Sequence, residues 1–381
     1  MTVTDERLRS VPTAAGRSIS DYRQLLLSSR ALIDVRAPVE FEKGAFPTSH
    51  NLPLMGDEER HLVGLRYKER GQEAAIELGA KLVPPELQQS IVLRWKAFVQ
   101  QHPDACLYCF RGGLRSRISQ QWLVDAGMDI PLVVGGYKAL RSFLLDELAR
   151  LCATQNFTLI GGRTGNGKTL LIHRLGSTVD LEHLANHRGS SFGGMPQEQP
   201  RNIDFENALT IELMRLESQG TSKVFLEDEA RLIGRVCIPD TLRQSMLEAP
   251  IYILECEMAE RIKNCFDDYV PDLLQRYQEK LGAHAGFEAY AEHHRGSLTR
   301  IRKRFGGENY QRAMQLLNIA LAAHQEDDDT TKYSPFIEML LRDYYDPMYD
   351  YQLNQKSERI VFKGTHEEIL EKAGSNLKAN E

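Results

Sequence analysis

Short apolar runs alternate along the chain with longer stretches of helical periodicity. The runs at residues 31–35, 105–108 and 131–134 have the length and composition of buried strands. Residues 86–101 instead place their apolar side chains at helical spacing, at Leu87, Ile91, Leu93, Trp95 and Phe98. Strands that alternate with helices in this way predict an α/β fold with a parallel sheet.

The same alternation starts again at residues 157–161, which predict the first strand of a second α/β unit. A chain of 381 residues also exceeds the size of one ordinary hydrophobic core. We therefore predict two domains, the first at residues 18–147 and the second, with helical additions, at residues 155–370. The polar residues 372–381 are expected to lack regular structure.

Composition narrows the class of protein. An apolar content of 42% and a charged content of 26% are typical of a globular protein in water. The formal net charge of −6 argues against a generally basic nucleic-acid binder, although it allows a local basic surface. We find no apolar run long enough to span a membrane, and residues 1–7 lack the pattern of a signal peptide, so a cytoplasmic location is expected.

The six cysteines are too few, in so long a chain, for a disulfide framework, and we expect them to be reduced. Cys106 and Cys109 form a C-x-x-C pair, but Cys256 and Cys265 are not spaced to complete a zinc site. A dithiol redox pair is less favoured, because Cys106 lies inside a predicted strand. We predict no metal site from these cysteines.

Cys109 is the cysteine with predicted chemistry. It lies between an apolar strand and a helix, where several backbone N–H groups and the helix dipole converge on one point. Such surroundings stabilise a thiolate. Gly112 and Gly113 let the backbone curl, and Arg111 and Arg115 add positive charge. We predict that Cys109 is catalytic and that the two arginines bind an anion beside it.

A second anion site is predicted at residues 162–169, which read G-x-x-x-x-G-K-T between a strand and a helix. The backbone N–H groups would bind a diphosphate or triphosphate, the lysine would reach the outer phosphate, and the threonine could hold Mg²⁺. The predicted binding residues are Gly162, Gly165, Asn166, Gly167, Lys168 and Thr169.

Three further stretches have both a functional and a plain interpretation. The strand 223–227 and the two acids after it could meet a metal or a water at the phosphate site, or form a solvated strand end. The loop 187–193 could contact an anion or lie on the surface. A basic stretch could contact a phosphate backbone or form a solvated helix face. Its cations are Arg295, Arg300, Arg302, Lys303, Arg304 and Arg312.

Several of these residues together resemble a rhodanese domain, which carries sulfur as a persulfide on a loop cysteine. The matching residues are Asp34-Val35-Arg36, Pro38, Glu40-Phe41, Gly44, Asn51, Pro53-Leu54, the Cys109 loop and Gly135-Gly136. One departure is that the usual Gly-His-Ile-Pro segment reads Gly44-Ala45-Phe46-Pro47, so no histidine role can be assigned there.

A rhodanese domain followed by a P-loop domain is similar to the bacterial tRNA 2-selenouridine synthases over nearly the whole chain. Other stretches typical of that family are Tyr67-Lys68-x-x-Gly71, residues 187–193 and Phe205-Glu206-Asn207. The resemblance implies a rhodanese-like first domain and a P-loop NTPase-like second domain. It also implies a transferase that replaces the sulfur of wobble 2-thiouridine in tRNA by selenium from selenophosphate.

The resemblance further implies that the same enzyme attaches a geranyl group to that sulfur, from geranyl diphosphate, before selenium enters. No tightly bound cofactor is expected, apart from Mg²⁺ that could bind at the P-loop. The expected partners are tRNA, contacted by the basic stretch, and the enzyme that produces selenophosphate. Whether the P-loop holds a nucleotide or the geranyl donor is open at this point.

Two other functions fit parts of the sequence. The spacing Cys109-x₅-Arg115 is also that of cysteine-dependent phosphatases, in which a thiolate attacks phosphorus. Those enzymes usually place a histidine before the cysteine, where this chain has Tyr108, and the comparison leaves the P-loop unexplained. A P-loop NTPase with an anion-sensing first domain is the other alternative, and it leaves Cys109 without a role.

Overall fold

The computed structural model describes residues 16–378 and divides the chain into two compact units. The first unit contains the residues up to Leu148 together with Glu206–Arg215, and the second contains Ala149–Phe205 and the residues from Leu216 onward. Both units have an α/β fold with a parallel sheet, as the sequence predicts, and each of these sheets has five strands.

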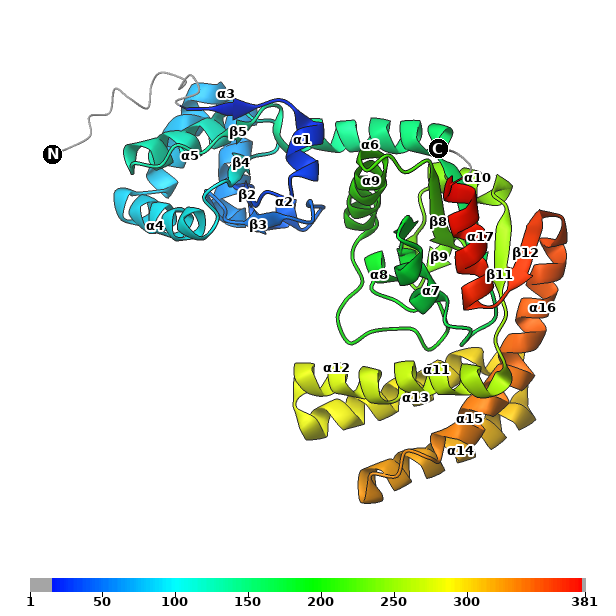
Figure 1. Ribbon diagram of the computed structural model, residues 1–381. Coiled ribbons are helices and arrows are strands. Elements are labelled where there is room, and N and C mark those ends of the chain that lie inside the picture. Colours follow the sequence, from blue (N-terminus) through cyan, green and yellow to red (C-terminus); the bar gives the residue numbers. More distant parts are fainter. Residues whose placement is uncertain (1–15, 379–381) are drawn as a thin grey trace. The chain divides into compact units, whose positions relative to one another are not determined.

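The first unit is a parallel sheet with strand order β1-β5-β4-β2-β3, flanked by helices (Figure 1). Its core gathers apolar side chains from the sheet and from the helices on it, including Ile33, Trp95, Leu107 and Leu123. The elements are β1 (Ser18–Ile19), α1 (Tyr22–Leu27), β2 (Leu32–Asp34), α2 (Pro38–Phe41), β3 (Ser49–Asn51), α3 (Asp57–Leu82), α4 (Pro85–Gln101), β4 (Cys106–Tyr108), α5 (Leu114–Asp125), β5 (Leu132–Val133) and α6 (Gly136–Thr154, whose residues from Ala149 onward belong to the second unit).

The second unit has the strand order β12-β11-β6-β8-β7, with a separate hairpin of β9 and β10. Its first elements are β6 (Asn156–Gly161), α7 (Lys168–Leu175), β7 (Thr178–Val179), α8 (Leu181–Leu184), α9 (Asn202–Ser218, which runs through both units), β8 (Lys223–Glu227), β9 (Leu232–Ile233), β10 (Val236–Cys237), α10 (Asp240–Glu248) and β11 (Ile251–Leu254).

A block of helices is inserted between the neighbouring strands β11 and β12 (Figure 1). It has a hydrophobic core of its own, built around Tyr290, Leu298, Leu317 and Phe336. The block and the elements after it are α11 (Met258–Tyr269), α12 (Pro271–Leu281), α13 (Ala283–Phe305), α14 (Gly307–Asp327), α15 (Tyr333–Leu340), the π-helix η1 (Leu341–Tyr345), α16 (Asp346–Gln355), the 3₁₀ helix η2 (Ser357–Arg359), β12 (Ile360–Gly364) and α17 (His366–Lys378).

One expectation about the chain end is wrong. Residues 372–378 continue helix α17, because Ile369 and Ala373 bury their side chains against the sheet of the second unit. Residues 379–381 lie outside the described part of the chain. Among the described helices, none is both long enough and apolar enough to cross a membrane.

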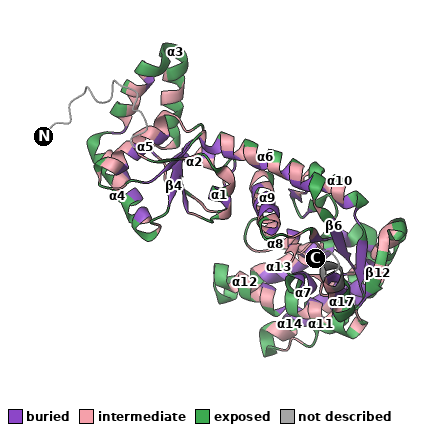
Figure 2. Cartoon of the chain, turned by 45° about the horizontal axis from the view of Figure 1, so that its top comes forward, coloured by how far each residue is buried: buried purple, intermediate pink, exposed green. Residues whose placement is uncertain are grey.

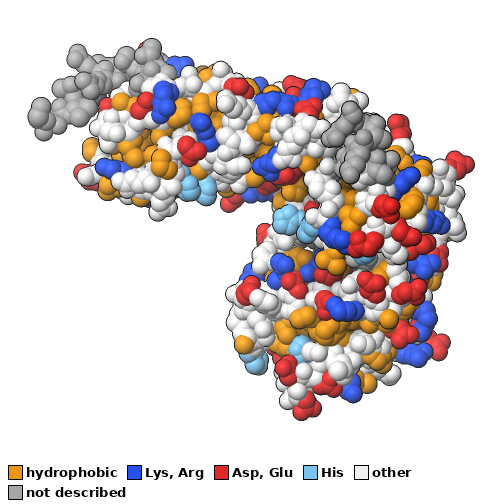
Figure 3. Space-filling model, in the orientation of Figure 1, with side chains coloured by type: hydrophobic (Ala, Val, Ile, Leu, Met, Phe, Trp, Pro, Cys, Tyr) orange, Lys and Arg blue, Asp and Glu red, His pale blue; other side chains and the backbone are white. Residues whose placement is uncertain are grey.

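Burial follows the layers of each unit. Figure 2 shows β4 and β6 as buried strands, while helices α3 and α4 turn exposed residues outward. On the face seen in Figure 3, Lys and Arg side chains are interspersed with Asp and Glu side chains.

Candidate functional site

Cys109 directly follows strand β4, and helix α5 begins five residues later, as the sequence predicts. The carbonyl oxygens of Cys109 and Phe110 accept hydrogen bonds from the N–H groups of Tyr137 and Lys138, at 2.9 and 3.0 Å. The N–H groups of Gly112 and Gly113 donate to no other residue of the described chain. The loop therefore binds the first turn of α6 through its carbonyls and keeps amide donors free for an anion.

Glycines make this close approach possible. A Cβ atom on Gly136 would lie 2.2 Å from the Cys109 carbonyl oxygen, and one on Gly112 would lie 2.6 Å from the Gly135 nitrogen. Both Gly112 and Gly136 also have positive φ, at 62° and 60°. Because the backbone of the cysteine loop packs directly on the glycine turn after β5, no larger residue fits at these positions.

The two arginines of the loop differ. Arg111 is exposed and lies over the ring of Phe110, 5.9 Å from its centroid. Arg115 donates two hydrogen bonds to Glu40 in helix α2. Burial alone would lower the pKa of Arg115, but the bonds to Glu40 and its negative charge raise it. Arg111 is thus the freer cation for a bound anion, and Arg115 is held by a carboxylate.

Sequence reasoning assigned no role to Glu40 or to the buried pair of Asp34 and Arg36. The Arg36 guanidinium lies 2.5 Å from Asp34, donates to the Gly44 carbonyl at 2.8 Å, and lies 4.0 Å from the ring centroid of Tyr137. The backbone N–H of Tyr137 also donates to the Cys109 carbonyl, so Arg36 contacts a residue that holds the cysteine loop in place. The sequence feature that could have indicated this ion pair is the D-x-R spacing at the end of a buried strand.

The second predicted site, residues 162–169, forms a loop between β6 and α7. Gly162, Gly165 and Gly167 all have positive φ, at 148°, 83° and 79°. Three side chains donate to carbonyls of this loop: Arg261 to Thr164, Asn264 to Gly165 and His366 to Gly167, at 3.0, 2.8 and 3.1 Å.

These bonds leave the amide side of the loop open. The N–H groups of Gly165, Gly167, Lys168 and Thr169 donate to no other residue of the described chain. The Lys168 ammonium bonds the Gly162 carbonyl at 3.3 Å, and the Thr169 side chain is exposed. Asn166 instead donates to the Leu254 carbonyl and is buried, so it shapes the loop. The arrangement suits a diphosphate group.

Carboxyl groups lie close to Lys168. Burial and the charge of Glu229 raise the pKa of Glu182 well above its usual value, and burial likewise raises the pKa of Glu229. The charges of Glu182 and Glu229 in turn help raise the pKa of Lys168, against the effect of burial. Glu227 is buried, and Asp228 and Glu229 are half-buried, so the strand-end acids are not a solvated end.

The other strand-end acids have structural partners. Glu227 is buried and accepts from the Leu181 N–H at 2.9 Å, and Asp228 binds the Lys356 ammonium at 2.8 Å. No group of three metal-ligating side chains occurs in the described part of the chain. Any Mg²⁺ at Thr169 would take its other oxygens from water and from the phosphates of a bound ligand.

The loop 187–193 joins the P-loop region to the helical block. A Cβ on Gly189 would lie 2.3 Å from a Glu182 oxygen and 2.8 Å from a Glu229 oxygen, so this glycine packs directly on both acids. Arg188 binds Asp272 at 2.5 Å, and Phe192 is buried in the helical core. The loop is thus an internal connection, and its arginine is already paired.

The basic stretch crosses two helices, because Gly306, with φ of 88°, separates α13 from α14. Of its cations, Arg300, Arg302, Lys303, Arg304 and Arg312 are exposed. Arg295 is half-buried and donates to Asn318 at 3.2 Å. In the described part of the chain these six cations form no ion pair with a carboxylate, a condition that favours an external anionic partner.

Comparison with known proteins shows the family to which this chain belongs. Residues 155–380 match the family model described as the tRNA 2-selenouridine synthase AAA domain. A tRNA 2-selenouridine synthase of Marinobacter nauticus is 50% identical over 93% of this chain and 97% of its own length. The synthase of Cupriavidus pinatubonensis is 50% identical over 90% of this chain and 94% of its own length. The synthase of Shewanella piezotolerans is 46% identical over 92% of this chain and 96% of its own length. The chain therefore belongs to the tRNA 2-selenouridine synthase family.

Proposed function

We propose that this chain is a tRNA 2-selenouridine synthase, a transferase that replaces the sulfur of wobble 2-thiouridine by selenium from selenophosphate. The observation that supports the proposal is that one chain of this family contains a cysteine loop and a P-loop, each with amide N–H groups that donate to no other described residue. A phosphatase would leave the P-loop without a role, and a P-loop NTPase with an anion-sensing first domain would leave the thiol of Cys109 without one.

The first domain, residues 18–147, is proposed to be rhodanese-like and to carry out the selenium step. Cys109 serves there as the nucleophile that helps move selenium to the base carbon. The phosphate of selenophosphate would bind the free amides of Gly112 and Gly113 and the exposed Arg111. Arg115 would contribute through its charge, which Glu40 partly balances.

The second domain, residues 155–370, is proposed to transfer a geranyl group from geranyl diphosphate to the sulfur of the base. Alkylation makes that sulfur a better leaving group for the entry of selenium. The amides of Gly165 and Gly167 would hold the diphosphate, and Lys168, with Mg²⁺ at Thr169, would stabilise the negative charge that develops on it. The same amide donors and lysine can bind the diphosphate of any ligand, so the proposed geranyl transfer requires no nucleotide.

The tRNA is proposed to lie along the exposed cations at the junction of α13 and α14, from Arg300 to Arg312. Such contacts with the phosphate backbone give affinity without reading sequence. We also propose that the enzyme works in the cytoplasm and receives selenophosphate from the enzyme that produces it.

The test is mass spectrometry of tRNA nucleosides from a strain that lacks the gene, complemented with wild-type or variant chains. We expect Cys109→Ser to abolish 2-selenouridine and to accumulate the geranylated base, and Lys168→Ala to abolish both. Cys106→Ser and Lys363→Ala are matched controls that should behave as wild type. Unchanged 2-selenouridine in the deletion strain would refute the function, and loss of selenation in Cys106→Ser would favour a dithiol mechanism instead.

A further inference from the structure

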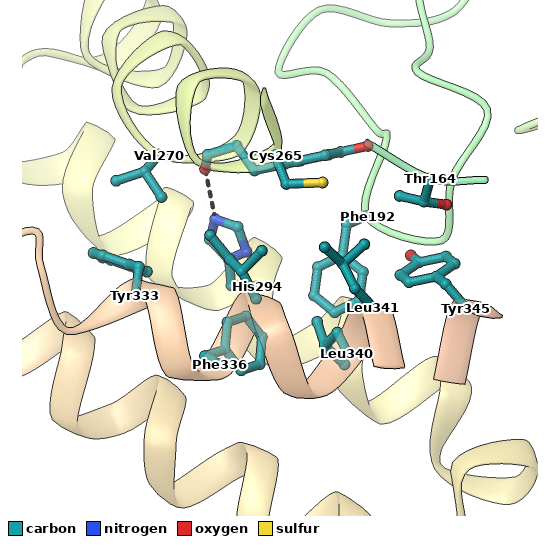
Figure 4. Close-up of a pocket in the computed structure, with 12 residues that line it drawn as sticks. Thr164, Phe192, Cys265, Val270, His294, Tyr333, Phe336, Leu340, Leu341 and Tyr345 are labelled. Carbon is teal, nitrogen blue, oxygen red and sulfur yellow. Dashed lines mark hydrogen bonds between the residues drawn. The ribbon is translucent and has the colours of Figure 1, made fainter. Parts of the chain in front are cut away.

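An apolar cavity of about 40 Å³ lies in the second unit, where the P-loop meets the helical block (Figure 4). Helices α11, α13 and α15, the π-helix η1 and the loop 187–193 contribute side chains to it. Carbon and sulfur atoms make up almost all of its surface. The side chains used below are Thr164, Phe192, Cys265, His294, Leu341 and Tyr345.

The cavity adjoins the phosphate site. Thr164 belongs to the P-loop and lines the cavity at the same time. Gly165 has no Cβ, and one placed there would lie 2.8 Å from the Cys265 sulfur, which is also in the cavity wall. On the other side, Tyr345 precedes by one helical turn Tyr349, whose ring centroid is 5.9 Å from the Lys168 ammonium. The cavity therefore shares the wall residue Thr164 with the loop that would bind the diphosphate.

The lining does not suit the base and ribose of a nucleotide. The one imidazole in it, His294, is buried, and its Nε2 is engaged with the Tyr269 carbonyl at 3.1 Å. Burial lowers the pKa of His294 to about 3, so the ring is neutral. Specific recognition of a base requires several hydrogen-bonding groups aimed at the ligand, and this cavity presents a hydrocarbon-like surface instead.

The backbone at the cavity is also unusual. Leu341 and Tyr345 are the first and last residues of the π-helix η1, between the α-helices α15 and α16. Such single π-turns are rare and often mark binding sites, because they re-aim side chains that a regular helix would turn elsewhere. Here the π-turn helps place Leu341 and Tyr345 in the wall that faces the P-loop (Figure 4).

We propose that this cavity receives the hydrocarbon chain of the diphosphate ester that the P-loop binds. The inference rests on the proposed function, which supplies the ester, and adds where its chain lies and what sets its length. The cavity has room for about three water molecules, at roughly 10–15 Å³ each, and is smaller than a ten-carbon chain. Phe192, which enters the cavity from a loop with glycines at 193 and 194, moves aside when the chain binds.

The experiment measures binding of inorganic pyrophosphate and of dimethylallyl, geranyl and farnesyl diphosphates, with Mg²⁺, by calorimetry on the full chain. In the wild type, geranyl diphosphate should bind at least about tenfold more tightly than pyrophosphate, because one buried methylene is worth about 10- to 200-fold. Leu341→Phe, which fills the cavity, should shift the preference to dimethylallyl diphosphate. Phe192→Ala, which enlarges it, should shift the preference to farnesyl diphosphate.

In both variants the affinity for pyrophosphate should stay within about twofold of the wild type, since the P-loop is unchanged. Ile319→Phe is the control for Leu341→Phe. It also replaces an aliphatic side chain by phenylalanine, but at an exposed position of α14, and it should keep the wild-type chain-length preference. The ratio of affinities among chain lengths does not depend on the fraction of folded protein, so partial misfolding would not obscure it.

The outcomes separate the inference from the proposed function. If the wild type geranylates tRNA but Leu341→Phe and Phe192→Ala keep its chain-length preference, the cavity is not the chain site. If ADP or GDP binds more tightly than geranyl diphosphate and loses affinity in Leu341→Phe, the cavity takes a nucleoside and the inference is overturned. If the wild type neither geranylates tRNA nor prefers geranyl diphosphate to pyrophosphate, the proposed function itself fails.

Discussion

Arg115 and Glu40 form a two-point ion pair, with Nη1 of the arginine 2.5 Å from Oε2 and Nη2 3.2 Å from Oε1 of the carboxylate. The same carboxylate binds Arg60 at 3.3 Å and accepts from the Ala37 N–H at 3.3 Å. Glu40, which lies in α2, therefore connects helix α5, which follows the Cys109 loop, to helix α3. It both holds Arg115 in place and offsets part of its charge.

Replacing Glu40 by glutamine should destabilise the first unit by about 1–3 kcal/mol at neutral pH, because it leaves the partly buried guanidinium of Arg115 without its charged partner. Burial opposes ionisation of Glu40, but the bonds and charge of Arg115 outweigh it and lower the pKa. The stabilisation is thus complete above the usual carboxyl pKa and is lost as pH falls through the lowered value. Urea unfolding can be followed by tryptophan fluorescence, since both tryptophans, Trp95 and Trp122, lie in the first unit.

Glu42→Gln is the control for this prediction, because Glu42 is exposed two residues away and should change stability by less than about 0.5 kcal/mol. Equal effects of the two substitutions, or an effect of Glu40→Gln that stays constant down to acid pH, would show that the pair contributes nothing.

Gly136→Ala should displace the cysteine loop. The added Cβ would meet the Cys109 carbonyl oxygen at 2.2 Å and the Gly112 nitrogen at 2.5 Å, in a residue whose φ is already 60°. Gly127→Ala is matched, because Gly127 has a φ of 82° but open space around it. We expect about 1 kcal/mol of destabilisation for Gly127→Ala, from backbone strain alone, and several times more for Gly136→Ala. Selenation should fall only in the latter, and equal losses would contradict the packing described.

His294 should make the second unit sensitive to mild acid. Burial lowers its pKa from 6.5 to about 3, so the unfolded chain binds a proton that the folded chain excludes. Stability is therefore full above pH 6.5 and falls by about 1.4 kcal/mol per pH unit below it. His294→Gln should flatten this dependence, as measured by thermal unfolding with circular dichroism between pH 7.5 and 5.5.

His284, exposed on the same helix α13, provides the comparison for His294. His284→Gln should leave the pH dependence of unfolding as it is in the wild type. A wild-type slope that persists in His294→Gln would assign the acid sensitivity to other groups, such as His187, whose pKa burial lowers to about 4.

Lys303→Gln should weaken tRNA binding and reduce the slope of log affinity against log salt by about 0.7–0.9, the value for one lost phosphate contact. Lys303 is exposed and has no carboxylate partner in the described part of the chain. Lys363→Gln removes one exposed lysine from strand β12 and should leave the slope unchanged. Identical slopes for the two variants would place the tRNA elsewhere.

Local patterns carried most of what the sequence could predict. The strand-loop-helix context of Cys109 and the spacing from Gly162 to Thr169 each lie within about ten residues, and the structure has both loops where expected. The partners of these loops come from far along the chain: Glu40 is 75 residues from Arg115, and His366 is 199 residues from Gly167. No spacing rule specifies such contacts, because they depend on the order of strands in the sheet.

Two other differences between the predicted and the observed structure have local causes in the sequence. The sequence predicts a phosphate-contacting surface or a solvated helix face for the basic stretch, and the structure divides that stretch between α13 and α14 at Gly306. The polar character of residues 372–378 likewise hid the helical spacing of Ile369 and Ala373, the two side chains that anchor α17. The cavity at Thr164 could not be predicted at all, since its walls come from five segments between residues 164 and 345.

The chain order of the first unit has a consequence for how the protein is made. Residues 206–215 complete that unit, and there Asn207 donates to the Ala45 carbonyl at 2.7 Å and accepts from Arg141 at 2.7 Å. A ribosome must therefore synthesise the whole P-loop and strand β7 before the cysteine domain can close its last contacts. A gene fragment that stops near residue 148 would encode an unfinished domain, and neither half can be obtained intact by a single cut.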